Sequence, residues 1–157
     1  NLTLYFQYLK IKLASLMNNS LVDDKIKELF VSYRTIAIVG VSADSYKDSN
    51  RIMKFLRNTG YKVYPINPHT DNKIINGEKV YKSLKEINDH VGIVNVFRPI
   101  EEVEDIAKQT IYIKANVLWL QLGIHNENAA KIVSENKIYY ISNKCIKIEY
   151  ERLFRKI

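Results

Sequence analysis

A segment that could bind phosphate begins at Gly40, directly after the apolar run Thr35–Val39. Gly40 permits a tight turn, and Ser42 and Ser49 carry hydroxyl groups beside the start of a predicted helix. The first backbone N–H groups of a helix have no partner within it, and they attract anions. The segment therefore predicts a site for a phosphomonoester or a diphosphate.

Three basic side chains follow this segment: Lys47, Arg51 and Lys54. Each could form a charge-assisted hydrogen bond with a phosphate oxygen, or could lie on the solvated face of the helix. Ser49 has two roles that do not exclude each other, contact with the ligand and capping of the helix N-terminus. The residue types alone leave these alternatives open.

Four further polar segments follow apolar runs later in the chain. They are Asn67-Pro68, Phe97-Arg98-Pro99, Gln121-Leu122-Gly123 and Asn143-Lys144-Cys145. Ligands of open parallel sheets bind outside the carboxyl ends of the strands. If the apolar runs form such a sheet, all these segments converge on one edge of it.

The elements that must position these residues alternate along the chain. Periodicity predicts strands over residues 35–39, 61–66, 91–97, 115–120 and 138–141. It predicts helices over residues 23–33, 49–59, 101–109, 127–136 and 145–154. Such alternation is typical of a parallel sheet with helices on both faces. We therefore expect an α/β fold: a Rossmann-like, doubly wound, three-layer domain with about five strands.

The usual dinucleotide fingerprint is incomplete. The pattern G-x-G-x-x-G would begin at Gly40, but Ser42 and Ser45 occupy the second and third glycine positions. Asn67-Pro68 stands where an acidic residue would hold a ribose hydroxyl. A standard nicotinamide or flavin dinucleotide site is therefore disfavoured.

The N-terminal part has a different character. Residues 1–16 contain no acidic residue, and part of them resembles a protease-cleavage linker added for recombinant expression. We expect residues 1–16 to be such an addition or an upstream extension, with Met17 as a natural start. Residues 17–157 are then expected to form a single domain.

Composition restricts the kind of ligand. The 157 residues include 24 Lys and Arg against 17 Asp and Glu, and more than half of the net charge of +7 lies at the two ends. This dilution favours a small anionic ligand over nucleic acid.

One cysteine and the lack of a long apolar run favour a cytoplasmic protein that does not cross a membrane. The three histidines lack metal-ligand spacing, so we expect no metal.

The stretch of residues 35–153 resembles the small stand-alone CoA-binding proteins, the YccU-like family, which are related to the CoA-binding domain of succinyl-CoA synthetase. The residues that carry the resemblance are 36–42, 49, 60–68, 77, 96–98, 118–124, 145–149 and 152. They occur in order over about three quarters of the chain. The resemblance implies a Rossmann-like domain that binds coenzyme A and has no established chemistry.

The resemblance also implies roles for individual residues. Gly40, Val41 and Ser42 would surround the pyrophosphate, with help from Ser49. The family usually has Arg-Pro before this serine, whereas Lys47-Asp48 stands here. Lys47 keeps the positive charge but loses the planar guanidinium, and Asp48 adds a negative charge.

The other implied site residues lie after the later strands. Asn67 and Pro68 would lie beside the adenosine or its phosphate, and Phe97 and Arg98 would border the nucleotide. Gln121 and Gly123 would form the pocket wall together with Trp119, which could pack in the core or stack on the ligand. Lys137 stands where the family commonly has glycine.

We therefore expect a nucleotide-binding protein that holds CoA or an acyl-CoA at the carboxyl edge of its sheet, without catalysis. The alternative is a CoA-dependent or atypical nucleotide-dependent enzyme that uses the same edge. Cys145 could then be a nucleophile or exchange with the CoA thiol, but no histidine stands near it in the sequence. A regulatory or DNA-associated module is a third class, which the diluted charge disfavours.

Overall fold

The computed structural model describes residues 1–155 and divides the chain into two compact units, Asn1–Ser32 and Tyr33–Ile157. The first unit is one helix, α1 (Leu2–Ser32). The helix predicted from residue 23 is therefore the last part of a much longer one. The segment contains no glycine or proline and is rich in leucine and lysine, which favour helix. Within residues 1–155, no helix is both long and apolar enough to cross a membrane.

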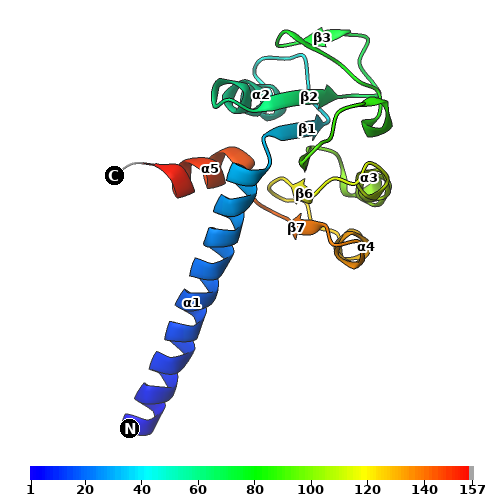
Figure 1. The fold of residues 1–157 in the computed structure, drawn as a ribbon. Helices are drawn as coiled ribbons and strands as arrows, with labels where there is room; N and C mark the ends of the chain where they lie inside the picture. The colour runs from blue at the N-terminus through cyan, green and yellow to red at the C-terminus, as the bar shows by residue number, and fades with distance from the viewer. Residues whose placement is uncertain (156–157) are drawn as a thin grey trace. The chain divides into compact units, whose positions relative to one another are not determined.

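The second unit contains a five-stranded parallel sheet. Its strands are β1 (Thr35–Val39), β2 (Lys62–Ile66), β5 (Ile93–Val96), β6 (Val117–Leu120) and β7 (Tyr139–Ile141). Their order is β2-β1-β5-β6-β7, and every pair is parallel (Figure 1). All five strands are predicted from the sequence, because buried parallel strands are continuous apolar runs.

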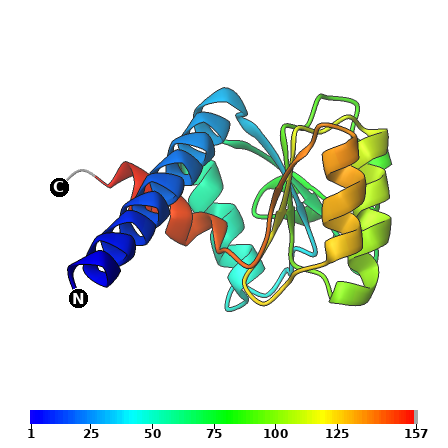
Figure 2. The same ribbon diagram turned by 90° about the horizontal axis from the view of Figure 1, so that it is seen from below.

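Four helices cover the sheet: α2 (Asp48–Asn58), α3 (Ile100–Tyr112), α4 (Glu127–Glu135) and α5 (Ile146–Phe154). Helix α2 packs beside α5, and α3 packs beside α4. Figure 2 shows the two pairs on opposite faces of the sheet. The Rossmann-like, three-layer prediction is therefore confirmed.

The connection from β2 to β5 contains elements that the periodicity does not predict. A short hairpin joins β3 (Ile74–Ile75) to β4 (Glu78–Lys79), and the turn residues Asn76 and Gly77 have φ angles of +48° and +80°. An Asn-Gly pair is a strong hairpin signal. A 3-10 turn, Leu84–Glu86, follows before β5.

The order of the strands creates the place where a ligand can enter. Strands β1 and β5 are neighbours, but the helix after β1 lies on one face and the helix after β5 on the other. A crevice forms outside the carboxyl ends of two strands at such a switch point. The residues directly after β1 and β5 are therefore the first candidates for ligand contact.

Candidate functional site

The sheet register brings the predicted site segments together. Val39, the last residue of β1, is paired with Ile66 on one side and with Val96 on the other. Val96 is in turn paired with Leu120 at the end of β6. The segments that begin at residues 40, 67, 97 and 121 therefore leave the sheet side by side, as the sequence predicts.

Gly40 lies at the crossing point between β1 and β5. Its φ is +97°, and its N–H donates a 2.8 Å hydrogen bond to the carbonyl oxygen of Ile66. A Cβ atom at this position would lie 2.8 Å from Cδ of Arg98 and 3.2 Å from the carbonyl oxygen of Phe97. Both the backbone angle and the space therefore require glycine.

The loop after Gly40 is held by the first turn of α2. The Ser42 N–H donates to Oγ of Ser49 at 3.0 Å, and Nδ2 of Asn50 donates to the Ser42 carbonyl at 2.8 Å. The N-cap of α2 is Lys47, so the capping alternative for Ser49 is wrong, while its contact with a ligand stays a prediction. The helix begins earlier than expected, which leaves the Ser49 hydroxyl inside the first turn, facing the loop.

Asn50 is a site residue that the sequence reasoning missed. It is 1% exposed, and its Oδ1 has no hydrogen-bond partner within residues 1–155. The only local signal in the sequence for such a role is that Asn50 directly follows Ser49. Asn50 lies in the first turn of α2, where its amide holds the loop after Gly40, a role that depends on how the loop folds.

The basic side chains near the loop differ in their surroundings. Arg51 pairs with Asp48 at 2.5 Å, and both side chains are largely exposed. Lys47 and Lys54 are also exposed. Asp48, which stands where the family usually has proline, therefore balances the charge of the Arg51 guanidinium.

Asn67 connects the ends of β1 and β2. Its Nδ2 donates to the carbonyl oxygen of Val41 at 2.9 Å, and its Oδ1 accepts from the His69 N–H at 2.8 Å. These bonds position the loop in which Val41 is fully buried. Pro68, the next residue, is exposed.

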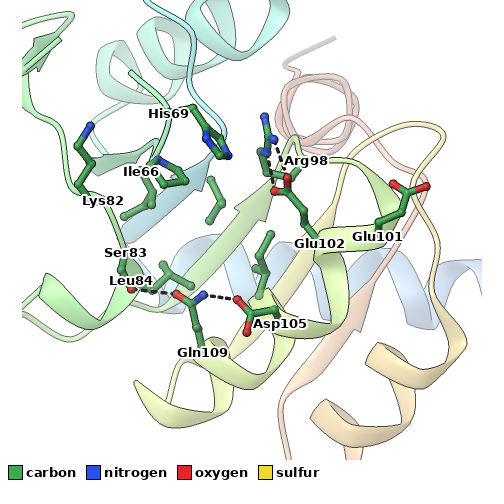
Figure 3. A pocket seen from close by; sticks show the side chains of 13 residues that line it. Ile66, His69, Lys82, Ser83, Leu84, Arg98, Glu101, Glu102, Asp105 and Gln109 are labelled. Carbon is green, nitrogen blue, oxygen red and sulfur yellow. Dashed lines mark hydrogen bonds and ion pairs between the residues drawn. The ribbon is translucent and has the colours of Figure 1, made fainter. Parts of the chain in front are cut away.

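A cavity of about 350 Å³ opens beside α3, and we call it the α3 cavity. Its polar lining includes Arg98, which forms two 2.7 Å hydrogen bonds with the carboxylate of Glu102 (Figure 3). The guanidinium beside Glu102 lowers the pKa of that carboxyl, and the charge of His69 adds to the effect. The other lining residues are Val39, Ile66, Pro68, Lys82, Ser83, Leu84, Glu101, Asp105, Ile106 and Gln109.

A second cavity, of about 480 Å³, lies on the other face, between α2 and α5, and we call it the α5 cavity. It is lined by Asp48, Arg51, Ile52, Phe97, Gln121, Leu122, Cys145, Lys147, Ile148 and Glu151. Of the predicted site residues, Phe97, Gln121 and Arg51 therefore meet here, while Pro68 and Arg98 meet in the α3 cavity. Volumes of this size are typical of small-molecule sites.

Gly123 and Trp119 line neither cavity. The Gly123 N–H donates to Oδ1 of Asn143 at 2.8 Å, and the space where its Cβ would lie is open. Trp119 is fully buried, and its Nε1 donates to the carbonyl oxygen of Lys144 at 2.8 Å. Trp119 therefore packs in the core, as one of the two alternatives predicts, and its ring is not placed to stack on a ligand in either cavity.

The histidines are dispersed in the fold. His69 lines the α3 cavity, His90 bonds to Asn116 at 2.7 Å, and His125 bonds to Ser142 at 3.0 Å. In the part of the chain that the structure describes, no group of three or more His, Cys, Asp or Glu residues could hold a metal ion. Lys137, at the position of the expected glycine, has a φ of +60°.

Comparisons with known proteins point to one family. The family model described as "CoA binding domain" matches residues 34–151. The uncharacterized protein YneT of Bacillus subtilis is 35% identical over 126 residues, which cover 80% of this chain and 92% of that protein. An ADP-forming acetate–CoA ligase of Methanocaldococcus jannaschii is 37% identical over 71 residues, but these are only 10% of the ligase.

Solved structures agree with this relationship. A hypothetical protein from Pyrococcus horikoshii OT3 superimposes with a TM-score of 0.80 at 34% identity, covering 83% of this chain and 91% of that one. A protein from Thermus thermophilus superimposes with a TM-score of 0.80 at 29% identity, covering 84% and 98%. The fold, the strand-end loops and these matches together show that the chain belongs to the CoA binding domain family.

Proposed function

We propose that this protein binds CoA or an acyl-CoA at the carboxyl edge of its sheet and catalyses no reaction on it. CoA carries a pyrophosphate and a ribose phosphate, and the family match supports CoA as the ligand. The observation that carries the proposed location is the close passage of Gly40 beside Arg98 at the switch point. The loop after Gly40, the start of α2, the α3 cavity and the α5 cavity all adjoin this position.

The pyrophosphate is proposed to bind at the loop and the start of α2. The first N–H groups of α2 supply a local positive potential, and Lys47 is exposed at the helix N-cap. Asp48 opposes this potential. The site therefore depends on backbone donors more than on side-chain cations.

The adenosine part is proposed to lie on the side of the α3 cavity. Pro68 offers an apolar surface there, while His69, Lys82 and Arg98 are the basic side chains of the lining. A ribose phosphate near Arg98 would compete with Glu102 for the guanidinium. The affinity for the ribose phosphate therefore depends on how strongly Glu102 holds the Arg98 guanidinium.

No catalytic residue is assigned. Cys145 lines the α5 cavity, whereas His69 lines the α3 cavity and the other two histidines bond to Asn116 and Ser142. No histidine is among the residues that line the α5 cavity, so no imidazole stands there to take the proton of the Cys145 thiol. Binding is the function that these surroundings support.

A thermal-shift comparison of CoA, dephospho-CoA, acetyl-CoA and NAD at matched concentrations tests the proposal. A ligand that binds only the native state at about 100 times its Kd raises the free energy of unfolding by ~2.7 kcal/mol. We expect CoA and acetyl-CoA to stabilise the protein, dephospho-CoA to do so less, and NAD to have little effect. Stabilisation by NAD without stabilisation by CoA would contradict the proposal.

Glu102→Gln tests the role of Arg98. The substitution removes the carboxylate that pairs with the guanidinium, so we expect CoA to bind about two- to fivefold more tightly, the range of an exposed ion pair. Dephospho-CoA should gain less, because it lacks the ribose phosphate. Isothermal titration calorimetry measures both ligands, and an equal gain for the two would place Arg98 away from that phosphate.

The same variant has an expected pH dependence. Because the pKa of Glu102 is lowered in the folded state, the pair stabilises the protein above the ordinary carboxyl pKa. That stabilisation is lost as the pH falls through the lower, folded-state pKa. The difference in stability between Glu102→Gln and the original protein should therefore begin to shrink near the ordinary carboxyl pKa, and should vanish only below the lowered pKa of Glu102, as urea unfolding at a series of pH values would measure.

A further inference from the structure

The first half of α1 carries large apolar side chains that are exposed in the structure. Five of them recur at alternating intervals of four and three residues, and each is between 39% and 73% exposed. They are Leu2, Phe6, Leu9, Leu13 and Leu16, which we call the α1 stripe. Soluble monomers rarely expose a continuous apolar surface, and such a surface usually marks an interaction site. The α1 stripe therefore indicates a partner.

The spacing places the α1 stripe on one side of a continuous helix. Helix α1 runs unbroken through these positions (Figure 1). An α-helix turns about 100° per residue, so the five positions fall within an arc of about 80°. Alternating intervals of four and three residues define the a and d positions of a heptad repeat, which pack against a second helix. The α1 stripe therefore has the geometry of a short coiled-coil seam, about 22 Å long.

The opposite side of the segment is less regular. Leu4, Tyr8 and Ile11 lie there and are exposed. The positions that continue this side along the helix are Ser15 and Asn18. A helix that lies on a membrane surface needs a strongly polar side toward water, and this segment has none. A second helix, which covers only the seam, therefore fits the pattern better than a lipid surface does.

The charges beside the α1 stripe are compatible with a second copy of this chain. Residues 1–22 contain two lysines and no acidic residue. Lys10 takes position e of the heptad, and Lys12 takes position g. In a parallel pair, position g of one helix lies beside position e in the next heptad of the other. Lys10 then lies beside Tyr5 of the other copy. Lys12 likewise lies beside Met17, so no two lysines meet across the pair.

The area of this surface sets the expected strength of the dimer. A large apolar side chain removes roughly 60–120 Å² from water when it is fully buried, at about 25 cal/mol per Å². Tyr5 and Met17, which flank the seam, are 59% and 60% exposed. Together with the seam side chains of both copies, they would bury roughly 500–1,000 Å². This area is below that of a stable interface, so we expect a weak dimer that depends on concentration.

We propose that the α1 stripe is the interface of a weak parallel dimer, in which the first halves of two α1 helices form a short coiled coil. Ser20 and Asp23 occupy the next two seam positions, so the apolar seam ends before them. The inference does not depend on the proposed function, because it uses no residue of either cavity.

Leu9→Lys is the direct test. Leu9 lies in the middle of the α1 stripe, and lysine keeps a high helix propensity but places two like charges at the centre of the dimer. Analytical ultracentrifugation of the full chain measures the dimer at protein concentrations of about 5–500 μM. We expect a Kd of roughly 10–300 μM for the original protein and a value at least about tenfold higher for Leu9→Lys.

Ile11→Lys is the matched control. Ile11 is 64% exposed and lies only two residues away, on the opposite side of the helix. The change in charge and size is similar, but the seam is untouched. We expect the Kd of the dimer to stay within about twofold of the original value. Circular dichroism should show the same helix content in both lysine variants.

Leu16→Cys tests the parallel arrangement. The natural Cys145 is the single cysteine of the chain, so Cys145→Ser supplies the background. Leu16 lies near one end of the seam and faces its own copy only if the helices are parallel. In a glutathione redox buffer, we expect Leu16→Cys to form a disulfide between two chains. Ile11→Cys should remain monomeric under the same conditions, as non-reducing electrophoresis would show.

Every other outcome overturns the proposal. A protein that stays monomeric over the whole concentration range has no such dimer. A dimer that the two lysine variants weaken equally, or that neither weakens, uses another surface. A dimer in which Leu16→Cys does not cross-link is not parallel. A monomer that sediments with phosphatidylglycerol vesicles, and loses this binding in Leu9→Lys, uses the α1 stripe for a lipid surface.

Discussion

Gly40→Ala is expected to lower the free energy of unfolding by about 2–5 kcal/mol, the sum of a positive-φ penalty and an overpacking penalty. At +97° the backbone angle disfavours any side chain, and the new Cβ would lie 2.8 Å from Cδ of Arg98. The Phe97 carbonyl, 3.2 Å away, cannot move without disturbing the end of β5. Since Arg98 must shift, we also expect CoA affinity to fall by more than about tenfold.

Gly123→Ala is the matched control for this substitution. Gly123 also has a positive φ, +80°, but nothing lies within 4 Å of the position of its Cβ. Its cost should therefore be the backbone penalty alone, about 1–2 kcal/mol, with CoA affinity retained. Urea unfolding measures both variants, and equal losses of stability and binding would show that the contact between Gly40 and Arg98 carries no specific cost.

Trp119→Ala is expected to cost about 3–5 kcal/mol, the usual range for a fully buried aromatic side chain. The indole lies in β6 and is 0% exposed. Its Nε1 also anchors the Lys144 carbonyl, next to Cys145 in the wall of the α5 cavity. The loss should therefore combine a large cavity in the core with an unpaired carbonyl.

Trp119→Phe separates the two contributions, because it keeps most of the apolar volume and removes the hydrogen bond. We expect an intermediate loss of stability and a modest loss of CoA affinity through the displaced loop around residue 144. Chemical denaturation and calorimetry measure the two effects. A variant with normal stability but abolished CoA binding would contradict the packing role and favour direct stacking on the ligand.

Much of the fold could be predicted because its signals are local. Each buried strand is a short apolar run, and residue 40 required a glycine that the sequence reasoning recognised. The Asn76-Gly77 hairpin could have been recognised in the same way, since its turn pair is a local signal. The predicted helix over residues 23–33 is shorter than α1, because residues 1–16 are interpreted as an extension, although their helix propensity is a local signal.

The sequence by itself determined the succession of strands and helices along the chain, the loop at Gly40 and the family resemblance, because these depend on neighbouring residues or on matched motifs. Only the tertiary structure decided which polar groups remain available at the site. Arg98 is occupied by Glu102, and Arg51 by Asp48. The Gln121 amide is oriented by Asn95 and Ile146, which are about 25 residues away in either direction. Contacts at such separations arise from the sheet order, and no local pattern encodes them.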